Sequence, residues 1–469
     1  MLRSIFQHLF VLSLVVHCCA LPAAAQEASG TGTDVLDLDQ CIAIAIERAA
    51  SAENARNKLK LSGVEVLKSY GQFLPTVTTR ATYTPVNVSR SYSAASEQTF
   101  RTDSETASLS VSAALNIFNG FGDYASLRQA LEGREAGRMS LERALQTIAY
   151  DVTEAYYQVL LDRELLKIAE ENLETSRNRL TLTRRQYEIG LKPVTEFYQQ
   201  QADTAQAELE VIRAEQRLFG SRIGLQKRLR IDPGTEVLIA SVTAEDILPA
   251  SPAATEALVD VALSSRPDLA GAARSSKAAE WGVVLARSTR WPSLDLQFTA
   301  STDGVNFYRD YSGTAVYPPL REQLEDGIDY SLGLNMNWTL FDGFLTRYGV
   351  EQAKVAQLRT LLAERDLRDD VVLDVRLAAG SLKAAITQLA TAEEGLKSAL
   401  KAYASVMKKF ELGAAGFIEA QNASASLVAA RSEKTQAAYN VALQKSALDY
   451  ATGRSPYQPK PSSGHVETE

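Results

Sequence analysis

The stretch Ile117-Phe118-Asn119-Gly120-Phe121 occurs a second time, in similar form, as Leu340-Phe341-Asp342-Gly343-Phe344. A second pair of similar segments is Tyr187-Glu188-Ile189-Gly190 and Phe410-Glu411-Leu412-Gly413. The separation between the two copies is the same for both pairs. Self-similarity at a fixed distance indicates that one structural unit is present twice.

A third matched pair lies upstream of these motifs. Phe73-Leu74-Pro75-Thr76-Val77 pairs with Arg290-Trp291-Pro292-Ser293-Leu294, at a slightly smaller separation. The second copy therefore has six extra residues between its proline and its Phe-Asp-Gly-Phe. We expect a first repeat over residues 26–240 and a second over residues 241–454, joined near residues 231–255. Each repeat is predicted to run helix, strand, strand, long helix, helix.

Alternation of apolar and polar residues predicts the strands. Residues 108–117, 294–301 and 331–340 alternate clearly, whereas the stretch after Pro75 is noisier. About ten alternating residues suit a membrane barrel strand, with one face in lipid and one facing a wet lumen. A sandwich strand with one face in a protein core would alternate in the same way.

The segments between the paired strands are polar. Residues 87–105 and 303–327 are rich in Ser, Thr, Asp, Tyr and Gly, so we expect surface loops there. The pair Pro318-Pro319 is expected to exclude a helix from the second loop.

Long helices are predicted to dominate the rest of the chain. No proline occurs between Gly120 and Gly190, or between Gly343 and Gly413. At about 1.5 Å per residue, each stretch would form a helix roughly 100 Å long. Return helices are expected from residue 194 towards 230 and from residue 417 towards 450. Helices of this length cannot be buried within one compact domain, which indicates a coiled-coil barrel.

Four strands cannot close a membrane barrel, and lipid does not tolerate an open sheet edge. If the strands span a membrane, several chains must therefore combine them. Three copies would supply twelve strands, within the usual range. No apolar run of eighteen residues follows Ala25, so no transmembrane helix is predicted.

The first 25 residues are predicted to be a cleavable secretory signal. Arg3 is followed by a short apolar run and then by Ala23-Ala24-Ala25, after which we expect cleavage. A lipoprotein signal ending at Cys18 or Cys19 is disfavoured, because neither cysteine follows a small residue.

Composition argues against an enzyme. The net charge of −8 becomes −9 once Arg3 is removed, and an acidic exported chain without a basic stripe is not expected to bind nucleic acid. After Ala25 the only cysteine is Cys41, which excludes an intrachain disulfide. The only histidine after Ala25 is His465, which argues against histidine-based zinc sites and catalytic triads. Neither a metal nor a cofactor is predicted.

Taken in order and twice over, these motifs resemble the TolC-like outer membrane efflux proteins, the outer membrane factors of tripartite efflux and type I secretion systems. A further mark is Arg266-Pro267-Asp268-Leu269, which opens a helix that runs towards Trp291 and has no Arg-Pro-Asp counterpart in the first repeat. The resemblance implies a mixed α and β membrane protein that forms a trimeric channel-tunnel. Each protomer would contribute four β-strands to a shared 12-strand outer-membrane barrel, above a long periplasmic α-helical barrel.

The function implied by the resemblance is that of a passive exit duct in the outer membrane of a Gram-negative bacterium. Its partners would be two further copies of the chain, outer membrane lipid, a periplasmic adaptor, and an inner-membrane RND or ABC pump. The residues alone leave open a periplasmic coiled-coil adaptor or scaffold, which would share the long helices. Such a scaffold would not need four alternating strands.

The resemblance also places a periplasmic aperture at the helical hairpin turns, Gly190-Leu191-Lys192-Pro193 and Gly413-Ala414-Ala415-Gly416. Glycine just past a helix end can cap it with a positive φ. Phe410, Ala415 and Asn422 stand where the best-known family pattern has tyrosine, arginine and aspartate, whereas Glu419 keeps a carboxylate. The aperture residues matched by position are Thr195 and Glu196 in the first repeat, and Phe410, Ala415, Glu419 and Asn422 in the second.

Each of these assignments has a simpler alternative. Three Glu419 side chains near one axis would attract cations, but Glu196 and Glu419 also suit the start of any helix, where the dipole favours acids. The pairs Arg184-Arg185 and Lys408-Lys409 are candidates for adaptor contact, although basic residues are favourable near any helix C-terminus. The tail, residues 455–469, is predicted to be disordered.

Overall fold

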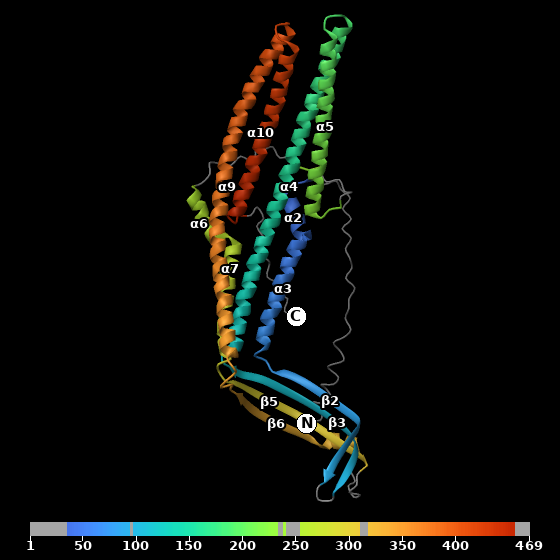
Figure 1. Ribbon diagram of the computed structural model, residues 1–469, viewed down its shortest axis with the longest axis vertical. Helices are drawn as coiled ribbons and strands as arrows, with labels where there is room; N and C mark the ends of the chain where they lie inside the picture. The colour runs from blue at the N-terminus through green and yellow to red at the C-terminus, as the bar shows by residue number, and fades with distance from the viewer. Residues whose placement is uncertain (1–34, 94–96, 233–237, 241–253, 310–317, 455–469) are drawn as a thin grey trace.

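The computed structural model describes residues 35–93, 97–232, 238–240, 254–309 and 318–454. The predicted signal peptide and the predicted disordered tail lie outside the described residues. The molecule is elongated, with a sheet at one end and two long helical hairpins reaching to the other (Figure 1). Within the described residues, none of the helices combines the length and the apolar character needed to cross a membrane.

The elements of the first half are one short strand, four helices and the first strand pair. They are β1 (Val35–Leu36), α2 (Leu38–Arg48), α3 (Ala50–Gly71), β2 (Thr76–Ser93), β3 (Gln98–Asn119), α4 (Gly122–Glu188) and α5 (Val194–Leu229).

The second half repeats this order after a short strand and adds one small helix between its paired strands. Its elements are β4 (Leu238–Ile239), α6 (Thr255–Ser265), α7 (Pro267–Ser288), β5 (Ser293–Arg309), α8 (Leu320–Asp326), β6 (Ile328–Asn337), α9 (Leu345–Glu411) and α10 (Phe417–Ala451).

Helix bounds in the two halves recur at fixed distances. Helices α2 and α6 each have 11 residues, and α3 and α7 each have 22, with the same separation between the members of each pair. Helices α4 and α9 each have 67 residues. Where one helix was predicted before each strand pair, the structure has two, because Ala49 and Arg266 are extended, with ψ of 128° and 122°.

The four long strands form one antiparallel sheet in the order β2-β3-β5-β6. Its register aligns Val77, Ala113, Phe298 and Leu332 in one row across the sheet. The adjacent row contains only hydroxyl side chains, and two of them, Thr78 and Ser112, are hydrogen bonded at 2.8 Å. The predicted alternation thus gives the sheet one apolar and one polar face.

The prediction that residues 87–105 form a loop is wrong. Strand β2 continues to Ser93 and β3 begins at Gln98. The stretch contains Thr, Val and Tyr residues, which are enriched in strands, and β3 here pairs with both β2 and β5. In the second predicted loop β5 continues to Arg309, and α8 starts directly after its N-cap Pro319, so Pro318-Pro319 precedes a helix instead of excluding one.

The repeated motif that opens the long helices turns the chain from strand to helix by two consecutive left-handed residues. Gly120 and Phe121 have φ of 68° and 66°, and Gly343 and Phe344 have 64° and 70°. In both copies the two phenylalanines of the motif are edge to face, with ring centroids 5.4 and 5.7 Å apart. A positive φ is uncommon for a bulky residue, so this junction explains why the motif is specific.

The polar residue of the motif caps the helix that follows. Asn119 Oδ1 accepts a hydrogen bond from the Asp123 amide at 3.2 Å, and Asp342 Oδ2 accepts one from the Thr346 amide at 2.7 Å. These bonds satisfy an amide in the first turn that has no partner within its own helix.

The core lies in the middle of the helical region, where each half has its own cluster. The first surrounds Tyr156 and includes Cys41, and the second surrounds Val371 and Val375. Strands β1 and β4 pair in parallel beside the first cluster, which the sequence did not predict. The Tyr156 hydroxyl donates to the Ala240 carbonyl at 3.0 Å and so ties the segment between the halves to α4.

Candidate functional site: the tips and roots of the helical hairpins

Each hairpin tip begins with a glycine in the left-handed conformation. Gly190 has φ of 77°, and the Leu191 amide donates to the Gln186 carbonyl at 2.8 Å. Gly413 has φ of 74°, and the Ala414 amide donates to the Lys409 carbonyl at 2.8 Å. These backward bonds close the ends of α4 and α9, so both tips have the same backbone geometry.

The first tip is braced by its own side chains. Lys192 Nζ lies 2.9 Å from Glu196 Oε2, and the stacked rings of Tyr187 and Phe197 have centroids 5.6 Å apart. Lys192 Nζ also lies 5.0 Å from the centroid of the Phe410 ring in the second hairpin. Phe410 therefore contacts the first hairpin through a cation–π interaction, for which no hydroxyl is needed.

The other predicted aperture residues are not brought together in the chain. Thr195 is exposed on α5, and Ala415 is half-buried at the second tip. Glu419 and Asn422 are both exposed on α10, and neither bonds to another side chain within the described residues. Of the six, only Glu196 and Phe410 share a partner, which is Lys192.

Two polar contacts that the sequence did not single out join the hairpins a few turns from the tips, on the side towards the sheet. Arg179 Nη2 donates to the Tyr403 hydroxyl at 2.8 Å, and Gln421 Nε2 donates to Asp203 Oδ1 at 2.5 Å. They border a groove of about 600 Å³ between the hairpins. Burial raises the pKa of Asp203 above its ordinary value, although the Gln421 bond and the Arg179 charge act in the opposite direction.

The basic pairs lie one turn before the tips. Arg184 Nε forms an ion pair with Glu188 at 3.1 Å. Arg185, Lys408 and Lys409 are exposed. Both basic pairs thus lie near the tips, and three of the four side chains face solvent without an ion pair among the described residues.

The end of α10 is held by side chains from other helices, and we call this contact the α10 root. Four successive carbonyls, of residues 450–453, each accept a hydrogen bond from a different side chain. The last carbonyls of a helix lack partners within it, and cations are favourable there. The donors are Arg143 at 3.0 Å, Arg266 at 3.3 Å, Ser265 at 2.8 Å and Gln146 at 3.1 Å, in the order of the carbonyls.

The two arginines of the α10 root are joined by one carboxylate, that of Asp268. Arg266, whose side chain is 4% exposed, lies 2.6 Å from Asp268 and 3.1 Å from Asp374. Arg143 lies 3.4 Å from Asp268, and its Cζ is 3.8 Å from the centroid of the Tyr450 ring. Burial opposes ionisation of Asp268, but the Arg266 hydrogen bond and the charges of both arginines outweigh it and lower its pKa.

The sequence identified Arg266 and Asp268 only as part of a motif, and it missed Arg143 and Tyr450. Arg143 meets Tyr450 across 307 residues of chain. No local pattern signals such a contact. The one available signal was the Arg-Pro-Asp motif, present in the second repeat alone.

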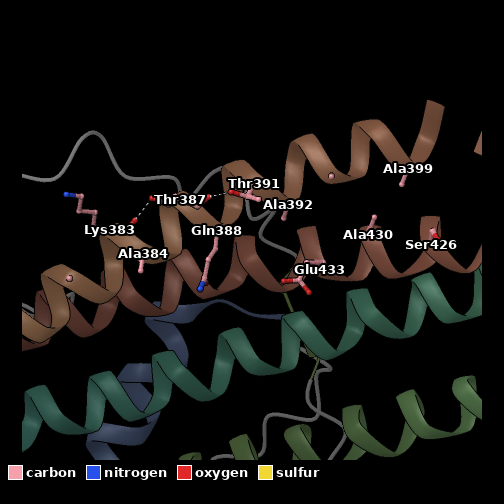
Figure 2. Close-up of a pocket in the computed structure, with 12 residues that line it drawn as sticks. Lys383, Ala384, Thr387, Gln388, Thr391, Ala392, Ala399, Ser426, Ala430 and Glu433 are labelled. Carbon is pink, nitrogen blue, oxygen red and sulfur yellow. Dashed lines mark hydrogen bonds between the residues drawn. The ribbon is translucent and has the colours of Figure 1, made fainter. Parts of the chain in front are cut away.

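A pocket of about 860 Å³ follows the groove between α9 and α10 (Figure 2). Small side chains such as Ala392 and Ala430 line it. The Thr387 and Thr391 hydroxyls donate to carbonyls of their own helix, at 3.0 and 2.9 Å. Polar side chains such as Glu433 also line it, so the pocket offers space that is only partly apolar.

Reactive groups are scarce in the part of the chain that the structure describes. No three His, Cys, Asp or Glu side chains in it are grouped to hold a metal ion. Burial, and to a smaller extent Asp37, raises the pKa of the Cys41 thiol to about 11. Cys41 is thus a protonated core residue at neutral pH.

The chain is similar in sequence to proteins of one known family. The family model described as outer membrane efflux protein matches residues 45–229 and 258–454. The outer membrane efflux protein BepC of Brucella suis biovar 1 is 26% identical over 449 residues, which cover 93% of this chain and 91% of BepC. The outer membrane protein TolC of Vibrio cholerae is 26% identical over 313 residues, covering 66% of this chain and 68% of TolC.

Solved structures share the fold. The outer membrane protein VceC of Vibrio cholerae superimposes with a TM-score of 0.74 at 16% identity, covering 89% of this chain and 96% of VceC. The MtrE outer membrane channel of Neisseria gonorrhoeae, in its open state, gives 0.71 at 18% identity and covers 89% of each chain. These relatives are channel and efflux proteins, not enzymes. The family model accounts for most of the residues, and the chain therefore belongs to the outer membrane efflux proteins, channels of the outer membrane that extend into the periplasm.

Proposed function

We propose that three copies of the chain form one continuous conduit through the outer membrane and into the periplasm. The carrying observation is the state of β6. Within the described chain it is an edge strand of the sheet, and all ten of its residues are exposed. An edge with unpaired backbone groups is not stable in lipid, so β6 of one copy pairs with β2 of the next. Twelve strands then close a barrel.

The faces of the sheet support this placement. Leu332, Leu334 and Met336 are 70%, 61% and 68% exposed in the single chain. Apolar surface of this extent on a folded monomer indicates a membrane or a partner. In the proposed barrel these side chains contact lipid, and the row of hydroxyls lines the lumen.

The equal helix lengths support an internal duplication. Residues 26–240 and 241–454 are proposed to be two repeats of one unit, so that a trimer presents six similar hairpins around its axis. The small side chains along the α9–α10 groove leave room for a helix of a neighbouring copy.

The conduit is proposed to be passive. An inner-membrane pump, of the RND or ABC type, supplies the energy, and a periplasmic adaptor connects it to the hairpin tips. The exposed Arg185, Lys408 and Lys409, with Arg184, supply the charges for adaptor contact. A soluble adaptor or scaffold would not need the apolar sheet face, and the family match favours the channel.

The aperture is proposed to lie at the tips. Glu419 and Asn422 of three copies face one another near the axis, with Thr195 and Glu196 on the neighbouring hairpins. Because Lys192 already neutralises Glu196, Glu419 supplies the net negative charge of the opening.

Two measurements test the assembly. Native mass spectrometry of detergent-solubilised protein should show three chains per particle. Single cysteines at positions 331–336 should react alternately with a lipid-soluble and a water-soluble maleimide. A monomer that stays soluble without detergent, or reaction with the water-soluble reagent at every position, would favour the scaffold.

A further inference from the structure

One face of α9 is not covered by the rest of the chain. Its residues recur every three or four positions and so form a stripe along the helix. The stripe lies on the side opposite Val371 and Val375, which are fully buried. Both ends of the stripe are apolar and its middle is acidic. Its members are Leu362, Asp366, Asp369, Leu373 and Leu377, of which Leu373 and Leu377 are 57% and 70% exposed.

In the repeat, the stripe on α9 occupies the position of the α4 surface that holds the end of α10. Helices α4 and α9 have equal length, so aligning their first residues matches Asp366 with Arg143 and Asp369 with Gln146. Arg143 and Gln146 bind the carbonyls of Tyr450 and Gly453. Within the described residues, neither Asp366 nor Asp369 has an ion pair or a side-chain hydrogen bond.

The counterpart of the α10 root is the end of α5. In the same alignment Tyr450 corresponds to Lys227, and Gly453 corresponds to Arg230. Gly453 and Arg230 both take the left-handed conformation after their helix, with φ of 76° and 53°. The side chains of Lys227 and Arg230 are exposed, and Ala49, which stands where the second half has Arg266, is too short to reach this helix end.

The chemistry of the two surfaces is therefore complementary. Two carboxylates stand on α9 where α4 has hydrogen-bond donors, and two cations stand on α5 where α10 has an aromatic ring and a glycine. In the proposed ring of six similar hairpins, α9 of one copy would meet α5 of the next as α4 meets α10 within the chain.

We propose that Asp366 and Asp369 of one protomer form ion pairs with Lys227 and Arg230 of the next. Each subunit boundary would then have a contact in the position of the α10 root, with ion pairs in place of the side chain–carbonyl hydrogen bonds. This inference rests on the proposed trimer and identifies the residues that select the neighbouring copy. Charges arranged in this way fix register and exclude wrong partners.

Apolar contacts on both sides exclude water from these pairs. Leu373 corresponds to Tyr150, whose ring stacks on Tyr450 with centroids 4.9 Å apart. Leu373 therefore covers the aliphatic stem of Lys227 in the next copy. Leu362 corresponds to Met139, which packs against Gly271 of α7, and it faces the corresponding part of α3 in that copy.

Cross-linking in intact outer membranes tests the proposal. In a Cys41→Ala background, Asp369→Cys combined with Arg230→Cys is treated with a short reagent that joins two thiols. Denaturing gels should then show linked dimers and trimers. The matched control pairs Asp369→Cys with Glu215→Cys. Glu215 lies earlier in α5, about 22 Å from Arg230 at about 1.5 Å per residue, so this pair should not link.

Charge reversal gives a second readout. Asp369→Arg should lower the temperature at which the trimer dissociates, and adding Arg230→Asp should restore it. A trimeric, conducting protein in which the test pair links no more than the control, or in which the double reversal restores nothing, would overturn this inference and leave the channel intact. A particle that contains one chain by native mass would overturn the proposed function itself.

Discussion

Apart from α8, the first and second halves of the chain contain matching helices and paired strands in the same order, yet they hold the ends of their return helices differently. The end of α10 is bound by four side chains from α4, α6 and the start of α7. The end of α5 is closed by its own backbone, where the Ile231 amide donates to the Gln226 carbonyl at 3.1 Å. The repeated pattern thus specifies the elements, and residues that break the repeat specify how each hairpin is attached.

The strand-to-helix junctions differ in a similar way. Both glycines have a positive φ, but a Cβ on Gly120 would lie 2.4 Å from the Ser288 carbonyl oxygen, whereas nothing lies within 4 Å of one on Gly343. The first junction is packed within the chain, and the second is open. An alanine at Gly343 would therefore measure the free-energy cost of the backbone conformation alone, and an alanine at Gly120 would add the cost of packing.

The largest effect is expected from Arg266→Ala. It leaves Asp268 and Asp374 without their shared cation and the Ala451 carbonyl without its donor. Each hydrogen bond to a charged group is worth about 1.5–3 kcal/mol, and Arg266 makes such bonds to Asp268, Asp374 and the Ala451 carbonyl. The melting temperature of the purified protein measures the loss. Arg222→Ala on the exposed side of α5 is the control. If both variants lowered the melting temperature equally, the α10 root would make no special contribution to stability.

Gly120→Ala should cost more than Gly343→Ala. Each alanine in a left-handed conformation costs roughly 1–2 kcal/mol. The clash at Gly120 adds about 1–3 kcal/mol, as overpacking does elsewhere. Thermal melts of the two variants, followed by circular dichroism, compare them directly. Equal losses would show that the packed junction relaxes without cost.

Acid should weaken the α10 root selectively. Because the folded pKa of Asp268 lies below its ordinary value of 3.8, its contribution is present above that value and is lost as the pH falls through the folded pKa. Asp268→Asn should therefore be less stable at pH 7 but lose less on acidification. Melting temperatures between pH 7 and about pH 3 test the sign, since the window spans the ordinary pKa of Asp. A parallel decline in both proteins would contradict it.

The smallest stability effects are expected at the tips. Lys192→Ala removes a partly exposed ion pair and the cation–π contact with Phe410, each worth about 1 kcal/mol or less. Glu419→Ala should leave the melting temperature unchanged, because the side chain is exposed. In planar bilayers, however, Glu419→Ala should weaken block by divalent cations and Lys192→Ala should not. Identical block in wild type and Glu419→Ala would refute the aperture role of Glu419.

Much of the fold was predictable because helix length and strand alternation are local properties. The glycines at 120 and 190 bracket α4, which spans Gly122–Glu188. The breaks at Ala49 and Arg266 were missed, because one extended residue inside a helical pattern leaves little trace in composition. The strands over residues 87–105 were missed because the composition there is polar, although the stretch also contains the β-branched and aromatic residues that strands favour.

The candidate site was less predictable than the fold. The capping glycines of the tips follow from local rules. Phe410 and Glu196 share one partner, Lys192. Because Lys192 lies on a different hairpin from Phe410, this contact could not be predicted from local sequence. The α10 root joins residues far apart in the chain, and only contacts in three dimensions identify it.

The most direct test of the central claim is single-channel recording of the detergent-purified protein in a planar bilayer. We expect discrete, cation-selective openings that divalent cations block from one side only. Well-folded trimers that never conduct, even after substitutions at the tips, would contradict the assignment of a conduit to this chain.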